Sequence, residues 1–254
     1  MSADPLVSIV TVVRNHAQGM CVTLESLRQQ DYPAIEHIVI DGASEDGTLD
    51  VLQQAQGQIT HLVSEPDRGI YDAMNKGVSL ARGPLLMHLN AGDRFAAPDA
   101  LRTLVQAIEQ AGADTAFSDL VYRGLEDGAR VSRIYGAQRW TPAALKKGWM
   151  PPHPTWLVRR NSLLRWGPYS LEYTIASDFD MMLRAYLLHR ASFVYVPQVT
   201  VEMEPGGISS QGVRSFLRAR RECCDALRRN GFKAGPFSLW SKVPAKIWER
   251  ARCL

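Results

Sequence analysis

The stretch Gly83-Pro-Leu-Leu-Met-His-Leu-Asn-Ala-Gly-Asp-Arg-Phe95 joins a mostly apolar run to a polar end. Residues 85–89 fit a central parallel strand, which is covered by helices on both faces. Residues 90–93 follow at its carboxyl end, where open α/β sheets bind ligands. Asp93 is therefore a candidate metal and diphosphate residue. On these residues alone, a loop that caps a helix beginning near Pro98 is an equally good interpretation.

The composition is that of a globular protein large enough for one α/β domain with additions. The chain has 254 residues, of which 46% are hydrophobic and 22% charged. No run approaches the roughly 18 apolar residues of a membrane span, and no basic or apolar leader precedes the first predicted strand. Four cysteines lack the spacing of a metal site, so we expect reduced thiols in a cytoplasmic protein.

Charge is distributed unevenly between the main part of the chain and its C-terminal segment. Residues 214–254 contain 11 Lys/Arg against 3 Asp/Glu, a net charge of +8, which leaves −5 for residues 1–213. We therefore predict a domain over 1–212 and a basic helical extension over 213–254. The extension suits an anionic surface such as a membrane, or is simply a solvated helical face.

Apolar runs alternate with helical segments along the first 95 residues. Strands are predicted at 7–13, 35–40, 59–63 and 85–89, and helices at 19–30, at 48–56 and up to residue 81. This order predicts right-handed parallel crossovers and a doubly wound sheet. Neither a Gly-x-Gly-x-x-Gly motif nor a P-loop follows the first strand, which argues against dinucleotide and P-loop sites.

Two polar positions near strand ends are candidates for nucleotide binding. Asp41 directly follows the second strand, where a carboxylate accepts hydrogen bonds from a base or a ribose. It is equally plausible as a turn residue. Arg68 precedes a helix, where a cation beside free N-terminal amides suits a diphosphate. The alternative is a solvated arginine in a surface turn.

Four motifs, at residues 7–15, 40–48, 67–77 and 89–93, resemble in content and order those of family-2 glycosyltransferases. The nearest branch is the bacterial exopolysaccharide and cell-envelope enzymes. The resemblance implies the Rossmann-like GT-A fold, with a nucleotide-binding half at 1–95 and an acceptor-side half at 96–212. It also implies a nucleotide-sugar donor, a divalent metal and inversion at the anomeric carbon.

Site residues follow from the resemblance position by position. Thr11 and Asn15 match the strand end that contacts the nucleotide, and Asp41 matches the aspartate that meets the base. Asn90 to Asp93 match the Asp-rich metal motif, with Asn90 on the donor side. Many members have three aspartates in this motif, whereas this chain keeps only Asp93 and has Asn90 and Gly92 at the other two positions. One carboxylate with donor phosphates and waters still suffices for Mg²⁺ or Mn²⁺.

The segment Met150-Pro-Pro-His-Pro-Thr-Trp156 provides candidates for the acceptor or diphosphate side. Its prolines hold the backbone stiffly, so His153 and Trp156 have defined positions. An aromatic ring offers an apolar surface to a sugar, and a histidine suits the diphosphate or the acceptor. A packed tryptophan and a structural histidine are the alternatives. The resemblance makes a contact by His153 as good an interpretation as a structural histidine, because the branch often has a His-x-x-x-aromatic stretch here.

Asp178 is the candidate catalytic base. An apolar stripe after it predicts a helix that begins near Ser177, where a carboxylate also favours the helix dipole. A purely structural aspartate at the helix start is therefore the alternative. The stretch resembles the family's Glu-Asp motif, in which the aspartate is the base, and Ser177 replaces the glutamate. Asp180, two residues further along a helix, should point elsewhere.

Two features near the C-terminus suggest mobile or membrane-associated elements. Gly206-Gly-Ile-Ser-Ser210 predicts a flexible loop that closes over the donor. Basic helices are predicted at 214–229 and 240–253, and the second has an apolar side suited to a membrane interface. We expect peripheral contact with the inner face of the membrane, where a lipid-linked acceptor is presented. Docking onto the enzyme's own body is the alternative.

The sequence as a whole predicts an inverting, metal-dependent glycosyltransferase. It moves a sugar from a nucleotide-sugar donor to a hydroxyl of a glycan or lipid-linked acceptor, without a nucleic-acid partner. Asp93 and Asp178 are expected to face one sugar-sized hollow. The alternatives are a non-catalytic nucleotide-sugar-binding or scaffold subunit and, with less support, a sugar nucleotidyltransferase.

Overall fold

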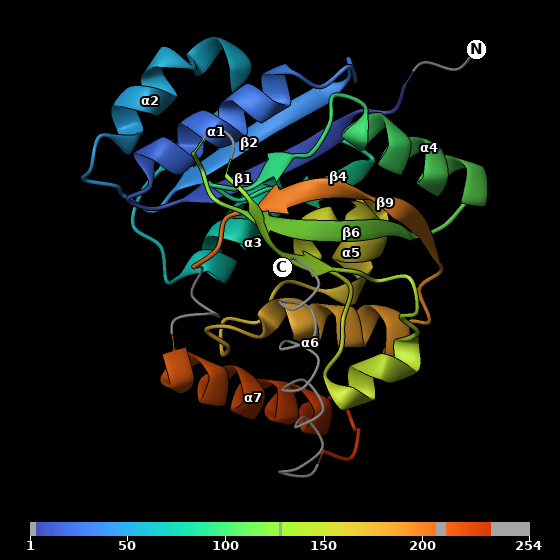
Figure 1. Cartoon of the computed structure of the whole chain (residues 1–254). Helices are drawn as coiled ribbons and strands as arrows, with labels where there is room; N and C mark the ends of the chain where they lie inside the picture. Colours follow the sequence, from blue (N-terminus) through green and yellow to red (C-terminus); the bar gives the residue numbers. More distant parts are fainter. Residues whose placement is uncertain (1–3, 127–128, 207–211, 235–254) are drawn as a thin grey trace.

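A nine-stranded sheet forms the centre of the protein in the computed structural model, which describes residues 4–126, 129–206 and 212–234. Figure 1 shows this sheet between two layers of helices. The strands are β1 (Val7–Val13), β2 (Ile35–Asp41), β3 (His61–Ser64), β4 (Leu85–His88), β5 (Arg94–Phe95), β6 (Thr115–Arg123), β7 (Val131–Tyr135), β8 (Leu157–Arg159) and β9 (Phe193–Met203).

The sheet is parallel in its first half and mixed in its second. Its order is β3-β2-β1-β4-β8-β6-β9-β5, with β7 paired to β6. Strands β1 to β4 run parallel, as the alternation of strands and helices predicts. Strand β8 is antiparallel to both β4 and β6, whereas β9 is parallel to β6. The carboxyl ends of β1, β2, β4, β6 and β9 therefore lie at one edge of the sheet.

Helices cover both faces of the sheet. They are α1 (Ala17–Arg28), α2 (Thr48–Gln54), α3 (Ile70–Leu80), α4 (Ala100–Ala111), α5 (Arg160–Trp166), α6 (Ser177–Leu183) and α7 (Gly212–Arg229). Short 3₁₀ turns cover Gln56–Gln58, Pro142–Lys147 and His153–Thr155, and a π-helical turn, Arg184–Leu188, continues α6. Helices α1, α2 and α4 lie on one face, and α3, α5 and α6 on the other (Figure 1).

Strand β1 shows why the sheet needs both layers. All seven of its residues are buried. Val10 and Val12 pack with α3 and α6, whereas Ile9 packs with α4 and Val13 with α1. Alternate residues of a strand point to opposite faces, so a continuous apolar run is stable only when helices cover both.

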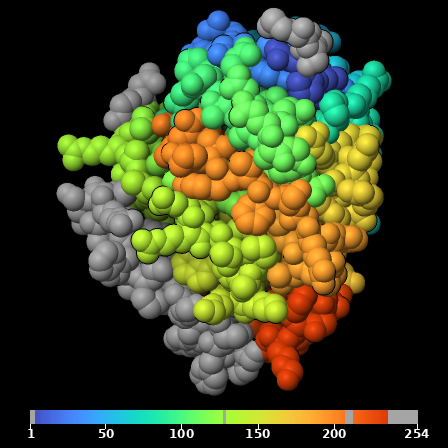
Figure 2. Space-filling model, turned by 90° about the vertical axis from the view of Figure 1, so that its right-hand side faces the viewer, coloured from blue at the N-terminus to red at the C-terminus, as the bar shows by residue number. Residues whose placement is uncertain are grey.

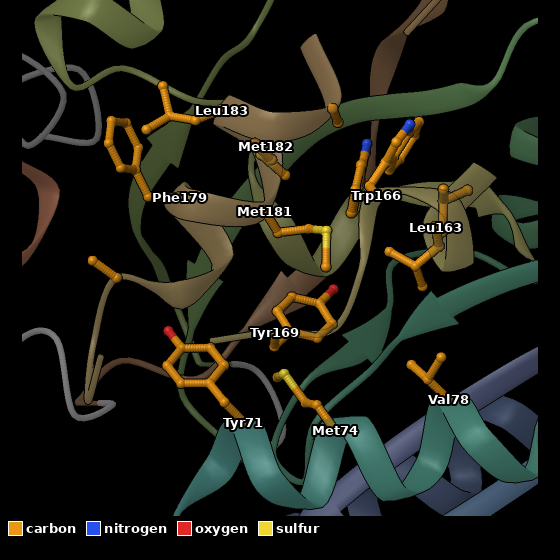
Figure 3. Packing of buried hydrophobic residues seen from close by; sticks show 14 of the residues in the cluster. Tyr71, Met74, Val78, Leu163, Trp166, Tyr169, Phe179, Met181, Met182 and Leu183 are labelled. Atoms are coloured by element: carbon orange, nitrogen blue, oxygen red, sulfur yellow. The ribbon is translucent and has the colours of Figure 1, made fainter. Parts of the chain in front are cut away.

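The core between α3 and α6 is rich in aromatic residues and methionines. Figure 3 shows Tyr169 between the two helices, facing Tyr71 and Met74 of α3. The rings of Tyr71 and Tyr169 are stacked with their centroids 6.0 Å apart. Met181 of α6 is fully buried in the same cluster. This packing fixes the beginning of α6 relative to α3.

Helix α7 packs against the outer side of α6. Its buried residues Cys223, Cys224, Ala226 and Leu227 belong to the same core cluster as α6. In the side view of Figure 2, α7 (red) lies at the bottom of the molecule, below the segment around β9 (orange). Helix α7 therefore uses one apolar face for docking onto the body of the protein.

None of the helices in the described residues is long and apolar enough to span a bilayer. The second predicted basic helix, 240–253, and most of the predicted glycine loop at 206–210 lie outside the described residues.

Candidate functional site

Polar residues from four strands meet at the carboxyl edge of the sheet. Asn15 and His16 follow β1, Asp41 ends β2, and Asn90 to Asp93 follow β4. Glu204 follows β9 and reaches across to His16, with Nε2 and Oε2 2.7 Å apart. The structure thus brings together residues that are up to 188 positions apart in the chain.

Asp41 organises the loop that follows β2. Its fully buried carboxylate accepts hydrogen bonds from the Ser44 amide at 3.1 Å, from the Ser44 hydroxyl and from the Ser64 hydroxyl at 2.6 Å. The Ser44 hydroxyl also accepts a hydrogen bond from the Asn15 amide at 2.7 Å. The turn interpretation of Asp41 has clear geometric support, because its carboxylate bonds to the loop itself.

Asn15 and Arg68 are exposed beside this loop. Asn15 adopts a left-handed conformation with φ of 51°, and its Oδ1 accepts a hydrogen bond from the Glu45 amide at 2.8 Å. The Arg68 side chain is 74% exposed, and Nη2 lies 2.8 Å from Asp72 Oδ1. Both side chains are accessible to a ligand at this edge. The positively charged Arg68 side chain lies just before the start of α3, where the sequence predicts it.

Thr11 has a different environment from the one expected. Its side chain is fully buried in β1, and its hydroxyl lies 3.0 Å from Nε2 of His37 on β2. The hydroxyl therefore joins two strands inside the sheet and does not open toward the edge.

Asn90 and Asp93 have buried oxygens that the protein leaves unsatisfied. Asn90 Oδ1 and Asp93 Oδ2 have no hydrogen-bond partner among the described residues. The loop that carries them is held by Thr23 of α1, whose hydroxyl donates to the Asp93 carbonyl at 2.7 Å. Burial raises the pKa of the Asp93 carboxyl to about 8, and the negative charge of the nearby Glu204 carboxylate acts in the same direction. Such a group gains from a cation that compensates its charge.

Asp178 lies in the first turn of α6, at the junction with α3. The Tyr71 hydroxyl donates to the Ile175 carbonyl at 2.6 Å, and its oxygen lies 3.4 Å from Asp178 Oδ1. Asp178 Oδ1 also accepts a hydrogen bond from the Phe179 amide at 2.7 Å. Burial, followed by the charge of Asp178, holds the pKa of Tyr71 well above its usual range, so Tyr71 keeps its proton.

Asp180 serves a structural purpose. It is 6% exposed, and Oδ2 accepts a hydrogen bond from Arg184 Nε at 3.0 Å. Its other oxygen, Oδ1, accepts one from Asn230 at 2.8 Å. Asp180 therefore links α6 to the end of α7 and faces away from the Tyr71 contact, as the helical spacing predicts.

His153 and Trp156 lie in the core. His153 Nε2 is 2.9 Å from the Tyr169 hydroxyl, and burial lowers the pKa of His153 to about 4. Trp156 is 1% exposed, and its indole N–H donates to the Tyr186 hydroxyl at 2.8 Å. The structure favours the packing interpretation for Trp156, because neither face of its ring is open to a sugar.

The chain matches a protein-family model described as glycosyl transferase family 2 over residues 8–167, more than half of its length. A glycosyltransferase from Mycobacterium tuberculosis is 34% identical over 215 residues, which cover 83% of this chain and 79% of the relative. The chain belongs to glycosyl transferase family 2. A PGL/p-HBAD biosynthesis glycosyltransferase from Mycobacterium bovis is 30% identical, with 85% of this chain and 84% of the relative covered.

Solved structures support the GT-A fold of this glycosyltransferase. Residues 1–349 of Staphylococcus aureus TarS, in complex with UDP-GlcNAc, match with a TM-score of 0.69 and 16% identity. The match covers 90% of this chain and 68% of TarS. The mannosyltransferase PcManGT from Pyrobaculum calidifontis, in complex with GDP-Man and Mn²⁺, matches with a TM-score of 0.63 and 19% identity, covering 99% and 70%. At this identity the likeness shows the fold alone.

The oxygens of Asn90 and Asp93 suit a divalent cation, because Mg²⁺ and Mn²⁺ prefer oxygen ligands. The part of the chain that the structure describes has no group of three or more His, Cys, Asp or Glu side chains arranged to hold a metal. The glycosyltransferase thus offers a partial set of ligands, which donor phosphates would complete.

Three residues that were not predicted as site residues contact candidate ones: His16 and Glu204 lie beside Gly92, and Tyr71 contacts Asp178. Tyr71 lies inside the 67–77 motif, so a signal was present in the sequence. Nothing in the local sequence relates Glu204 to His16, because their contact depends on the pairing of β9 with β5, which sets Glu204 beside Gly92 and His16.

Proposed function

We propose that this glycosyltransferase is metal-dependent and inverting. It would transfer a sugar from a nucleotide-sugar donor to a hydroxyl of a glycan or lipid-linked acceptor. The observation that carries this proposal is the pair of unpartnered buried oxygens on Asn90 and Asp93, in a loop at the carboxyl ends of the parallel strands. Such a loop suits the charged end of a donor.

Asn15, the loop ordered by Asp41, and Arg68 support binding of the nucleotide-sugar donor. Asn15 and the loop ordered by Asp41 form one side of the edge, where a nucleoside would lie. Arg68, at the start of α3, would neutralise part of the diphosphate charge. Thr11 would support the site indirectly, because its contact with His37 holds β1 against β2.

Asp93 and Asn90 would hold Mn²⁺ or Mg²⁺ together with the donor diphosphate. When bound, the cation neutralises the charge that develops on the leaving nucleoside diphosphate. The buried position of Asp93 strengthens this electrostatic attraction, because water is largely excluded there.

Asp178 would act as the general base. The acceptor hydroxyl oxygen forms a bond to the anomeric carbon as the bond to the diphosphate oxygen breaks, and the hydroxyl proton passes to the Asp178 carboxylate. The leaving diphosphate departs with the bonding electron pair, and attack from the opposite face inverts the anomeric carbon. Such a base contributes about 10²–10⁴-fold to the rate. Tyr71 would position Asp178 by holding the first turn of α6.

The names of the relatives suggest the biological setting. The Mycobacterium bovis relative is named for PGL/p-HBAD biosynthesis. We infer that this chain likewise acts on an acceptor of the cell envelope, with a peripheral position at the membrane that places it near lipid-linked acceptors.

The decisive experiment compares Asp178→Asn with the wild type. The variant is expected to lose at least about 100-fold in kcat, because it lacks a proton acceptor, while donor affinity changes less than about threefold. A panel of UDP-, GDP- and dTDP-sugars, tested by thermal shift with and without Mn²⁺, first identifies the donor. Product formation and binding are then measured for both proteins.

Asp99→Asn is the matched control, because Asp99 likewise lies at the start of a helix, α4, and is exposed. It should retain wild-type rates. Equal loss of donor binding and turnover in Asp178→Asn would show that Asp178 is structural. Donor binding by the wild type without turnover would instead favour the non-catalytic alternative.

A further inference from the structure

The motif at 90–93 lacks carboxylates at two positions, and the structure shows what lies beside one of them. Gly92 is buried and has φ of 95°. A Cβ atom at this position would lie 2.5 Å from Glu204 Oε2. The glutamate carboxylate thus occupies the space next to the Gly92 backbone, where a side chain of residue 92 would begin.

Glu204 is also close to the remaining acidic residue of the motif. The antiparallel pairing of β5 with β9 sets Arg94 opposite Glu202, so Glu204 lies beside Gly92 and Asp93. The negative charge of Glu204 also adds to the effect of burial in raising the pKa of Asp93. Asp93 is 3% exposed, and its Oδ2 has no partner among the described residues. An unpartnered, buried carboxylate oxygen therefore lies within the same cluster as the Glu204 side chain.

We propose that Glu204, from the end of β9, supplies the acidic group that position 92 lacks and serves with Asp93 to hold the divalent cation. This inference rests on the proposed metal-dependent function. The absence of a Cβ atom at Gly92 makes room for the Glu204 carboxylate, so the glycine at position 92 is what allows Glu204 to lie there. His16 positions the carboxylate through its contact with Oε2 at 2.7 Å.

The arrangement explains how a motif with one aspartate keeps enough negative charge for a cation. Two protein carboxylates with donor phosphates match the way Mg²⁺ is commonly bound. The described residues contain no preformed cluster of three ligands, so donor phosphates would complete the coordination. A structural interpretation, in which Glu204 only joins β9 to His16, is the competing one.

Glu204→Gln separates the two interpretations. Glutamine keeps the length of the side chain and a hydrogen bond to His16, but removes the charge. Mn²⁺ affinity is measured by titration of the apoprotein, following the electron paramagnetic resonance signal of free Mn²⁺. We expect Glu204→Gln to raise the Kd for Mn²⁺ by about 10–100-fold, and Asp93→Asn to raise it at least as much.

The matched control is Glu109→Gln, which removes a carboxylate paired with Arg159 at the far end of α4. It should leave the Kd for Mn²⁺ within about twofold. Thermal unfolding and circular dichroism verify that each variant is folded. A Kd for Glu204→Gln within twofold of the wild type, with binding lost in Asp93→Asn, would overturn this inference and leave the proposed function intact. No Mn²⁺ binding by the wild type, either alone or with the nucleoside diphosphate of its donor, would overturn the metal assignment itself.

Discussion

At the scale of single residues, burial decides how the ionisable groups behave. His37 is 3% exposed and His153 is 6% exposed, and burial lowers the pKa of each to about 4. His88, at the end of β4, is stacked on His153 with the ring centroids 5.5 Å apart, and burial holds its pKa well below the usual range. All three histidines are therefore neutral in the folded protein at pH 7.

These histidines predict a loss of stability in mild acid. A histidine has a pKa of about 6.5 in the unfolded chain, so that state binds a proton first as the pH falls. The free energy of unfolding is thus highest above pH 6.5 and decreases between 6.5 and about 4. Each of His37 and His153 should contribute a loss of about 2 kcal/mol between pH 6.5 and 5.

The prediction is tested by urea unfolding of the wild type and His37→Gln at pH 7, 6 and 5. His37 contacts the Thr11 hydroxyl inside the sheet, so the variant will be less stable at every pH. Its free energy of unfolding should nevertheless vary less steeply with pH, because unfolding of the variant takes up about one proton fewer. Identical slopes for the two proteins would contradict the assignment.

At the scale of secondary-structure elements, the first turn of α6 places two aspartates in different surroundings. Asp178 lies beside Tyr71 of α3, whereas Asp180 pairs with Arg184 and Asn230. Arg184 also donates to the carbonyls of Trp166 and Pro168. Asp180 therefore belongs to a network that joins the loop after α5, helix α6 and the end of α7.

Asp180→Ala should destabilise the protein without removing the proposed base. Loss of one partner from a largely buried ion pair costs about 3–5 kcal/mol, because the remaining charge stays unpaired. The Arg184 and Asp180 side chains are 16% and 8% exposed, so we expect about 3 kcal/mol, measured by denaturant unfolding. Below its unfolding temperature, the variant should turn over within about threefold of the wild type. A larger loss of turnover than in Asp178→Asn would make Asp180 the better candidate for the base.

At the scale of the whole molecule, α7 has two different surfaces. Its buried face docks onto α6, and the Glu222 carboxylate accepts hydrogen bonds from the Ile175 and Ala176 amides at 2.8 and 3.0 Å. Its outer face exposes Val213 and Leu217. The arginines that are exposed on the helix are Arg214, Arg218, Arg221, Arg228 and Arg229. Docking onto the protein therefore leaves a basic surface available.

Charge reversal on this outer face tests the proposed membrane contact. Truncation after Gly212 would also remove Glu222 and disturb the start of α6, so substitutions are the cleaner test. The wild type should float with phosphatidylglycerol liposomes. A variant with glutamate at positions 214, 218 and 221 should lose about 100-fold in affinity, because each arginine near an anionic surface contributes about 1 kcal/mol.

The control variant has the same change in net charge, with glutamate replacing the exposed Arg28, Arg82 and Arg165 elsewhere on the surface. It should float as the wild type does. A wild type that remains unbound would leave α7 with docking onto the protein as its only supported role.

Local sequence determined most of the sheet and its helices. The predicted strand 7–13 coincides with β1, and β2, β4 and the helices α2, α4 and α7 begin within two residues of their expected positions. Helix α3 ends one residue before its expected end. These segments have strong apolar periodicity, which depends only on neighbours in the chain. Strand β8 was not predicted, because three residues carry no periodic signal. It forms only because β4 and β6 lie on either side of it.

Tertiary structure decided which side chains share the site. The sequence, through the order of its motifs, identified the family and marked Asp93 and Asp178 as candidates. It could not show that Thr11 and Trp156 have their polar groups engaged in the core, or that Glu204 lies beside Gly92. Periodicity specifies the face of a helix or strand, whereas contacts between distant segments depend on how the sheet is ordered and which strands become neighbours.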